Sequence, residues 1–374
     1  MVYWRASLEQ VHSKVMSRKP KLPLRKGWTT GACAAAAALA AFEALETGVF
    51  PDPVSIRLPK GERPLFELAC MDLVDGAATA GIVKDAGDDP DVTHGVTVLA
   101  TIRRNVPGTG IIFHAGDGVG TVTKPGLPVV SGEPAINPGP RKMIGDALLD
   151  SAEALDVTAD LDVTIAIPGG EEIAKKTWNP RLGIVGGLSI LGTTGIVHPY
   201  SCSAWIHSIH QGIDVARATG VDHVAGVTGR TSEAAIGKMY GFDEGALIDM
   251  GDFVGGMLKY LRRHPIERLT VGGGFAKMVK LAQGNLDLHS SRSQVDFKQL
   301  AQWLADLGAE PDDVARAEQA NTAAQILMSA GSIEIGGLVA RRAREVALAT
   351  LSGRTAVEIV IVDRNGTVVG RADG

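Results

Sequence analysis

The sequence predicts an α/β protein of two domains, an α+β domain followed by a Rossmann-like parallel βαβ sheet. The length of 374 residues suits two domains. After about residue 197, strand-like and helix-like runs alternate at the spacing of parallel βαβ units. The 46 glycines, beside only 5% aromatic residues, indicate many tight turns and close backbone approaches. The expected divisions are a lead-in over residues 1–24, an α+β domain with acidic and glycine-rich loops over 25–196, and a Rossmann-like domain over 197–374.

The first domain is expected to begin with a buried helix. Thr29 and Thr30 offer an N-cap, the helix runs to about Glu46, and Gly48 and Pro51 end it. Its alanine-rich surface suits tight packing against a sheet. The 1–24 lead-in is expected to hold a short helix. Strands are expected over 54–58, 65–72, 96–103, 119–123 and 161–167, with a helix over 138–155.

The second domain is expected to alternate between strands and helices. Strands are predicted over 223–227, 246–249 and 268–271, and helices over 204–219, 232–240, 253–263 and 275–283. The tail is predicted helical from Val295 to Leu351. It is followed by a hairpin over 356–363 and 367–371, turning at Asn365-Gly366.

Charge and cysteine content exclude several functional classes. The net charge of −5 provides no basic field for nucleic acid, so a polyanionic small molecule would need a local cationic patch. Three scattered cysteines without CxxC spacing fit a reducing cytoplasm and argue against disulfides or structural zinc. No apolar run is long enough to span a bilayer, so we expect no membrane role. A homo-oligomer is left open.

An acidic loop lies between residues 83 and 95. It holds four aspartates and one histidine, and such crowding raises carboxyl pKa values unless cations or hydrogen-bond donors compensate. One interpretation is a proton-handling or ligand-orienting loop, with Asp85, Asp88 and His94 as candidate catalytic residues. The alternative is a solvated turn whose aspartates cap backbone amides. A calcium loop is disfavoured because the EF-hand spacing is absent.

Cations also stand at the start of the predicted helix after Asn137. Pro140 suits the first helical position, which puts Arg141 and Lys142 in the first turn, where they oppose the helix dipole. A bound anion would offset that cost. The alternative is that both side chains simply extend into solvent.

Three loops of the second domain follow a predicted strand and open a helix, where open α/β sheets bind nucleotides and adenosyl cofactors. An acid there can accept hydrogen bonds from a ribose, or it can merely cap a helix. The candidate cofactor-binding residues are Gly226, Thr228, Gly229, Asp249, Asp252, Gly272, Gly273 and Gly274. The glycine-dense stretch 183–195 matches neither GxGxxG nor Walker A, and its glycines can equally serve packing.

Several segments together resemble one family. They are GWTTGACAAA at 27–36, the acidic loop at 83–95, residues 136–143, residues 167–191 with PGGEEIAKKT and NPRLGI, GTTGIV at 192–197, and GGGFAKMVK at 272–280. This pattern resembles the CbiD family, the cobalt-precorrin-5B C-1-methyltransferases of the anaerobic corrin route. The resemblance extends from about residue 25 to the end. The family often has Tyr at Trp28 and Thr at Ala32.

The resemblance implies a two-domain α/β and α+β enzyme. Its reaction would transfer a methyl group from S-adenosylmethionine to carbon 1 of cobalt-precorrin-5B, giving cobalt-precorrin-6A. Cobalt would arrive with the substrate, so no protein metal site is expected. The acetate and propionate side chains of that substrate would need cations and polar groups, for which the candidates are Thr29, Thr30, Arg141, Lys142, Lys175, Lys176 and Arg181.

Two other functions stay open. One is a nucleotide-binding small-molecule transferase or kinase, against which the absence of a phosphate-loop lysine counts. The other is a non-catalytic corrinoid carrier, which would bind the ring without the adenosyl cofactor.

Overall fold

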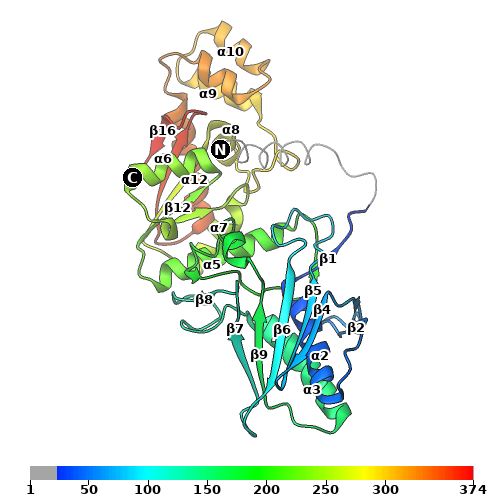
Figure 1. Ribbon diagram of the computed structural model, residues 1–374. Helices are drawn as coiled ribbons and strands as arrows, with labels where there is room; N and C mark the ends of the chain where they lie inside the picture. Colours follow the sequence, from blue (N-terminus) through cyan, green and yellow to red (C-terminus); the bar gives the residue numbers. More distant parts are fainter. Residues whose placement is uncertain (1–22, 374) are drawn as a thin grey trace, which may run out of the picture. The chain divides into compact units, whose positions relative to one another are not determined.

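The computed structural model describes residues 23–373, and the chain forms two compact units that interleave along the sequence (Figure 1). Of the described residues, the first unit holds those up to Val119, then Pro134–Ile173 and Leu188–Tyr200. The second holds Gly120–Glu133, Ala174–Gly187 and the chain from Ser201 onward. Two stretches of the predicted 25–196 domain thus pack with the second unit. The short helix expected within 1–24 lies almost wholly outside the described residues.

The first unit is built on a five-stranded sheet of mixed orientation. Its order is β4-β5-β6-β9-β7. Each of the first four strands is antiparallel to its neighbour among them, and β7 is parallel to β9. Helices α2 and α3 pack together, and α2 lies against β5 and β6 (Figure 1). The bounds are β4 Cys70–Val74, β5 Ala77–Val83, β6 Thr97–Arg104, β7 Ile111–Ala115, β9 Leu161–Ala166, α2 Thr30–Thr47 and α3 Pro138–Leu155.

The alanine helix α2 confirms its prediction. Thr29 Oγ1 accepts a hydrogen bond from the backbone N–H of Ala32 at 3.1 Å, which caps the helix. Gly48 ends it in the left-handed conformation, with φ of 79°. All nine alanines of α2 are buried, since small side chains let the helix approach the sheet closely.

Small two-stranded pairs and one short helix complete the first half of the chain. The antiparallel pairs are β1 Gly27–Trp28 with β11 Ile196–Val197, β2 Val54–Ser55 with β3 Leu65–Phe66, and β8 Thr121–Val122 with β10 Ile184–Val185. The helix α4 spans Gly170–Ala174. By the division above, the β8–β10 pair belongs to the second unit.

The second unit is built on a five-stranded sheet in the order β13-β12-β14-β15-β16. The first four strands are parallel and β16 is antiparallel, which confirms the predicted βαβ alternation and the terminal hairpin. Ile236 of α6 packs with Val227 and Val360 in one apolar cluster, while helices α5, α7, α8 and α12 contribute to another. The bounds are β12 His223–Val227, β13 Leu247–Asp249, β14 Arg268–Gly274, β15 Ala356–Val362, β16 Val368–Ala372, α5 Cys202–Ala218, α6 Arg230–Tyr240, the 3₁₀ turn η1 Glu244–Ala246, α7 Val254–Leu261, α8 Phe275–Ala282 and α12 Ile335–Leu351.

The structure corrects several predicted elements. Strands β5 and β7 were not expected, and the run expected as a strand over 65–72 divides into β3 and the start of β4. Gly272–Gly274 lie inside β14 rather than in a loop. The tail is not one helix: Gly308, with φ of 82°, and Gly331, with φ of 56°, lie at breaks between helices. Before α12 it consists of α9 Phe297–Asp306, α10 Pro311–Glu318 and α11 Ala323–Ser329.

Candidate functional site

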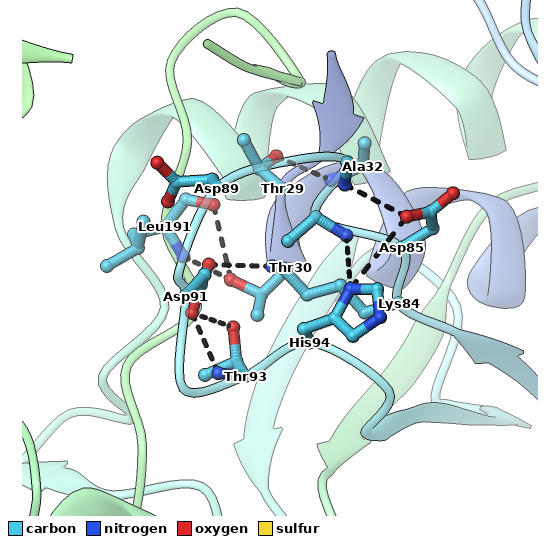
Figure 2. Close-up of polar contacts among 12 residues, drawn as sticks. Thr29, Thr30, Ala32, Lys84, Asp85, Asp89, Asp91, Thr93, His94 and Leu191 are labelled. Carbon is cyan, nitrogen blue, oxygen red and sulfur yellow. Dashed lines mark hydrogen bonds and ion pairs between the residues drawn. The ribbon is translucent and has the colours of Figure 1, made fainter. Parts of the chain in front are cut away.

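The acidic loop joins β5 to β6 in the first unit, and one of its residues is a buried lysine that pairs with an aspartate of the same loop (Figure 2). The side chain of Lys84 is 1% exposed, and its Nζ donates to Asp91 Oδ2 at 2.7 Å. Asp91 Oδ1 accepts from the backbone N–H and the hydroxyl of Thr93, at 2.7 and 2.6 Å. Burial tends to raise the pKa of Asp91, but Lys84 and Thr93 outweigh it and the pKa is lowered.

Arg25 compensates the charge of two further aspartates. Its guanidinium makes a bidentate contact with Asp85, through Nη1 to Oδ2 and through Nη2 to Oδ1 at 3.0 Å. The Arg25 hydrogen bond, followed by the Gly87 N–H, holds the pKa of Asp85 at about 2. The backbone N–H of Arg25 donates to Asp88 Oδ2 at 2.6 Å. Asp85 and Asp88 therefore fasten residues near 25 to the loop.

His94 and Asp89 are placed differently from these anchors. Nδ1 of His94 accepts a hydrogen bond from the backbone N–H of Ala86 at 3.1 Å, so Nε2 carries the proton of the neutral ring. The His94 side chain is 54% exposed and lies 3.8 Å from Asp85. Asp89 accepts from the backbone N–H of Tyr200 at 2.8 Å, yet burial raises its pKa. No sequence pattern distinguishes Asp89 or Lys84 from the other charged residues of the loop. The partner of Asp89 lies 111 positions away, and the burial of Lys84 is a property of the folded unit.

The two predicted substrate-binding threonines of the first unit accept hydrogen bonds from the backbone of the same unit. Thr29 caps α2, and the Thr30 hydroxyl accepts from the Leu191 backbone N–H at 3.0 Å. Both threonines are buried. Packing also explains part of the glycine-rich stretch, because a Cβ on Gly192 would lie 2.3 Å from Thr29 Oγ1.

The two cations of α3 differ from one another. Arg141 Nε donates to the carbonyl of Ile136 at 2.8 Å and Nη2 to that of Pro134 at 3.2 Å. Its guanidinium also lies 5.3 Å from the Phe113 ring centroid. Lys142 pairs with Asp146 one turn along at 2.8 Å and is exposed. Arg141 thus fixes the loop before α3, whereas Lys142 presents its ammonium to solvent.

The other predicted substrate-binding cations belong to the second unit. Lys175 and Lys176 are exposed just after α4. Arg181 is partly buried and donates to Glu233 Oε1 at 2.6 Å. Sequence reasoning grouped these three with Arg141, Lys142, Thr29 and Thr30, and the division into two units separates them.

The carboxyl ends of β12, β13 and β14 bring the predicted cofactor-binding residues together. The chain passes from β12 to β13 on one side and then to β14 on the other side of β12. The Thr228 N–H donates to the Gly272 carbonyl at 3.0 Å, joining the ends of β12 and β14. Gly229, which precedes α6, has no atom within 4 Å of a built Cβ.

The strand glycines have unequal surroundings. A Cβ on Gly226 would lie 2.4 Å from Met257 Cε, and one on Gly272 would lie 1.9 Å from Ile236 Cδ1. A Cβ on Gly273 would lie 2.7 Å from Thr228 Oγ1, whereas one on Gly274 would have no atom within 4 Å. Gly226, Gly272 and Gly273 therefore serve close packing within the unit, and Gly274 borders open space.

Two carboxylates and one lysine lie beside this end of the sheet. Asp249, the last residue of β13, accepts from the Gly251 N–H at 3.2 Å, and burial raises its pKa. Lys277 Nζ donates to the Thr228 carbonyl at 2.9 Å and lies 3.2 Å from Asp252 Oδ1. This arrangement offers hydrogen-bond acceptors and a cation at the point where the strand order reverses.

In residues 23–373, no three His, Cys, Asp or Glu side chains gather as a metal ion would need. Over the same residues, none of the helices combines the length and apolar character required to cross a bilayer.

Comparisons with known proteins cover nearly the whole chain. The family described as CbiD matches residues 16–199, and the CbiD C-terminal domain matches residues 287–373. A protein of Paramagnetospirillum magneticum named cobalt-precorrin-5B C(1)-methyltransferase is 59% identical over 93% of this chain and 98% of its own. A Brucella canis protein of the same name is 60% identical, over 94% of this chain and 96% of the length of the relative. A crystal structure described as a cobalamin biosynthesis protein (cbiD) from Archaeoglobus fulgidus is 29% identical, covers 72% of this chain and 83% of its own, and has a TM-score of 0.39.

Proposed function

The chain belongs to the CbiD family, and on this premise we propose that it methylates carbon 1 of cobalt-precorrin-5B, with S-adenosylmethionine as the donor. The identity of 59% with a relative of that name, across 93% of this chain and 98% of the relative, carries the proposal. The similarity therefore covers nearly the full length of both proteins and is not limited to one domain. The product would be cobalt-precorrin-6A.

We assign binding of the methyl donor to the carboxyl end of the five-stranded sheet of the second unit, which we treat as Rossmann-like. Ligands of open α/β sheets bind where the strand order reverses, which here is between β12 and β14. The residues fit an adenosyl group: Gly274 borders open space, and Asp249 is a partly buried acceptor at the end of β13, where a ribose needs one. When bound, the donor supplies an electrophilic methyl group on a sulfonium. The contribution of the protein is to hold that methyl group in line with the ring carbon.

We assign proton handling to the acidic loop of the first unit. Asp85 is committed to Arg25, so its carboxylate orients the loop instead of exchanging a proton near neutral pH. Asp88 accepts a backbone N–H and takes a similar role. His94 offers Nε2 on an exposed ring, and Asp89 has a raised pKa. Asp89 is suited to accept the proton released as ring conjugation rearranges. The Nε2–H of His94 is suited to donate a hydrogen bond to the substrate, because Nδ1 already accepts the Ala86 N–H.

Exposed lysines are the best candidates for the carboxylates of the substrate. Lys142, Lys175 and Lys176 are exposed, so their ammonium groups are accessible to an anionic ligand. Arg141 and Arg181 are engaged inside their own units, and we assign them to positioning.

Calorimetry with S-adenosylhomocysteine, followed by single-turnover methylation of the cobalt precorrin, tests the proposed function. We expect the product thioether to bind and the wild type to methylate the ring. A kinase-like transferase would instead bind magnesium and ATP. A carrier would bind the coloured ring without affinity for the thioether, and either result would overturn the proposal.

A further inference from the structure

We propose that Lys277 and Asp252 form a subsite for the amino-acid end of the methyl donor. The ammonium of Lys277 would bind the α-carboxylate, and the carboxylate of Asp252 would bind the α-ammonium. The subsite would make the second unit select a zwitterionic adenosyl thioether over a neutral one. This inference rests on the proposed donor site, and it adds a residue, Lys277, that the sequence did not single out.

Lys277 is positioned by one hydrogen bond and keeps further N–H donors for a ligand. It lies in the first turn of α8, which follows β14, and its Nζ donates to the carbonyl of Thr228 just after β12. The lysine therefore spans the two strands between which the strand order reverses. An ammonium has three donors, and the Thr228 bond at 2.9 Å uses one. The side chain is 35% exposed, so a ligand can reach it.

Asp252 has a carboxylate oxygen that accepts no hydrogen bond within the described residues. Its Oδ1 is buried and, within the described residues, has no hydrogen-bond partner. Lys277 Nζ stands 3.2 Å away, but the approach is that of an ion pair without hydrogen-bond geometry. A buried carboxylate oxygen left in this state is unfavourable, and a ligand ammonium would satisfy it. The side chain is 24% exposed and its terminal torsion is soft, so the carboxylate can turn toward a ligand.

The surroundings favour a carboxylate beside Lys277. The first backbone N–H groups of α8 lack partners within the helix and point to the same end, next to Gly274. A Cβ built on Gly274 meets no atom within 4 Å, which leaves room there. Lys280 of the same helix is buried and donates to the Leu288 carbonyl at 2.8 Å, adding a second cation.

The test compares two adenosine thioethers by calorimetry on the full chain. S-adenosylhomocysteine has the amino-acid end, and 5′-methylthioadenosine lacks it. We expect Lys277→Met to weaken binding of the homocysteine compound about tenfold or more, the scale of one charge-assisted hydrogen bond, and to leave the methylthio compound unchanged. Asp252→Asn should show the same selectivity. Lys277→Arg should retain most of the discrimination, and Lys259→Met on the exposed side of α7 is the matched control.

The outcomes separate the subsite from the donor site. If the wild type binds S-adenosylhomocysteine and Lys277→Met weakens both compounds equally, the lysine is only structural and the subsite is rejected. Unchanged affinity for both compounds in Lys277→Met and Asp252→Asn rejects it as well. If the wild type binds neither compound, the donor site itself fails. Thermal melting of each variant identifies loss of fold, and Lys277→Gln then replaces Lys277→Met.

Discussion

The ammonium of Lys84, which is almost entirely buried in the acidic loop, lies 2.7 Å from Asp91 Oδ2. Lys84 depends on this ion pair more than Asp91 does. Asp91 is 25% exposed and has Thr93 as a second partner, whereas Lys84 is 1% exposed. A buried cation that loses its counter-ion cannot be rehydrated in place.

Asp91→Asn is therefore expected to destabilise the first unit more than Lys84→Met does. Breaking a buried pair from one side costs about 3–5 kcal/mol. Lys84→Met keeps the volume and leaves a carboxylate that water can reach. Thermal melting of both variants measures the order, with Lys142→Met, from an exposed pair, as the control. Equal losses, or a larger loss for Lys84→Met, would contradict this account.

Acid should weaken the acidic loop through Asp85. Its folded pKa of about 2 lies below the ordinary value of 3.8, so its stabilising contribution is present above pH 3.8 and disappears as pH falls toward 2. We expect Asp85→Asn to flatten this part of the stability profile. Melting temperatures between pH 5 and about 2 test it, with Asp146→Asn as a matched exposed carboxylate. Parallel profiles for wild type and Asp85→Asn would show that the Arg25 contact does not act in solution.

Arg141→Ala is expected to lower the stability of the first unit more than it weakens substrate binding. The change removes donors to the carbonyls of Ile136 and Pro134, and hydrogen bonds from a charged group are worth about 1.5–3 kcal/mol each. Lys142→Ala should leave the melting temperature nearly unchanged and raise the apparent KM. Melting curves and steady-state kinetics of the two variants decide the matter. A normal melting temperature with a raised KM in Arg141→Ala would place the guanidinium on the substrate.

Two adjacent glycines of α12 should respond oppositely to alanine. A Cβ on Gly336 would lie 1.7 Å from the backbone oxygen of Val369 in β16, so the helix or the strand must move. Such overpacking costs ~1–3 kcal/mol or more. A Cβ on Gly337 would meet only Arg341 and Glu334 side-chain atoms, at 3.4 and 3.5 Å, and should gain about 0.5–1 kcal/mol of helix stability. Urea denaturation of the two single variants measures both signs, and a stable Gly336→Ala would refute the close α12–β16 contact.

His94→Gln and Asp89→Asn are expected to slow single-turnover methylation by about 10²–10⁴, the scale of a positioned acid or base. The corrin should still bind, because neither change removes a cation. Asp88→Ala should instead lower the free energy of unfolding by ~0.5–2 kcal/mol, the scale of a lost side-chain acceptor for a backbone N–H, and leave the rate nearly intact. Normal rates in His94→Gln and Asp89→Asn would remove both residues from the chemistry.

Local signals in the sequence predicted the helices well. Thr29 and Gly48 bracket α2, and Pro138 and Pro140 begin α3, because capping depends on residues within one turn. Strand β5 escaped prediction since its sequence, AATAGIV, is rich in residues with weak strand preference. Its place in the sheet depends on pairing with β4 and β6. Gly272–Gly274 read as a loop for the same reason, although β15 pairs with all three.

The acidic loop was predictable as a cluster, but the roles within it were not. Asp88 meets Arg25 across 63 positions of sequence, and Asp89 meets Tyr200 across 111. The ion pair decides that Asp85 has a depressed pKa, and burial decides that Asp89 has a raised one. Composition shows that four carboxylates must be compensated, and only the tertiary structure assigns a partner to each.

The interleaving of the two units bears on how the protein can be divided for experiment. A fragment beginning at Ser201 keeps all five strands of the second sheet but lacks Gly120–Glu133 and Ala174–Gly187. It would lose the β8–β10 pair together with Arg181, the partner of Glu233 on α6. The complementary N-terminal fragment would carry those two stretches without the surfaces on which they fold. A cut before Ser201 therefore leaves the segments of the first unit together on the N-terminal fragment but divides the second unit between the two fragments. Recombining homologous genes at this crossover would join mismatched parts of the second unit.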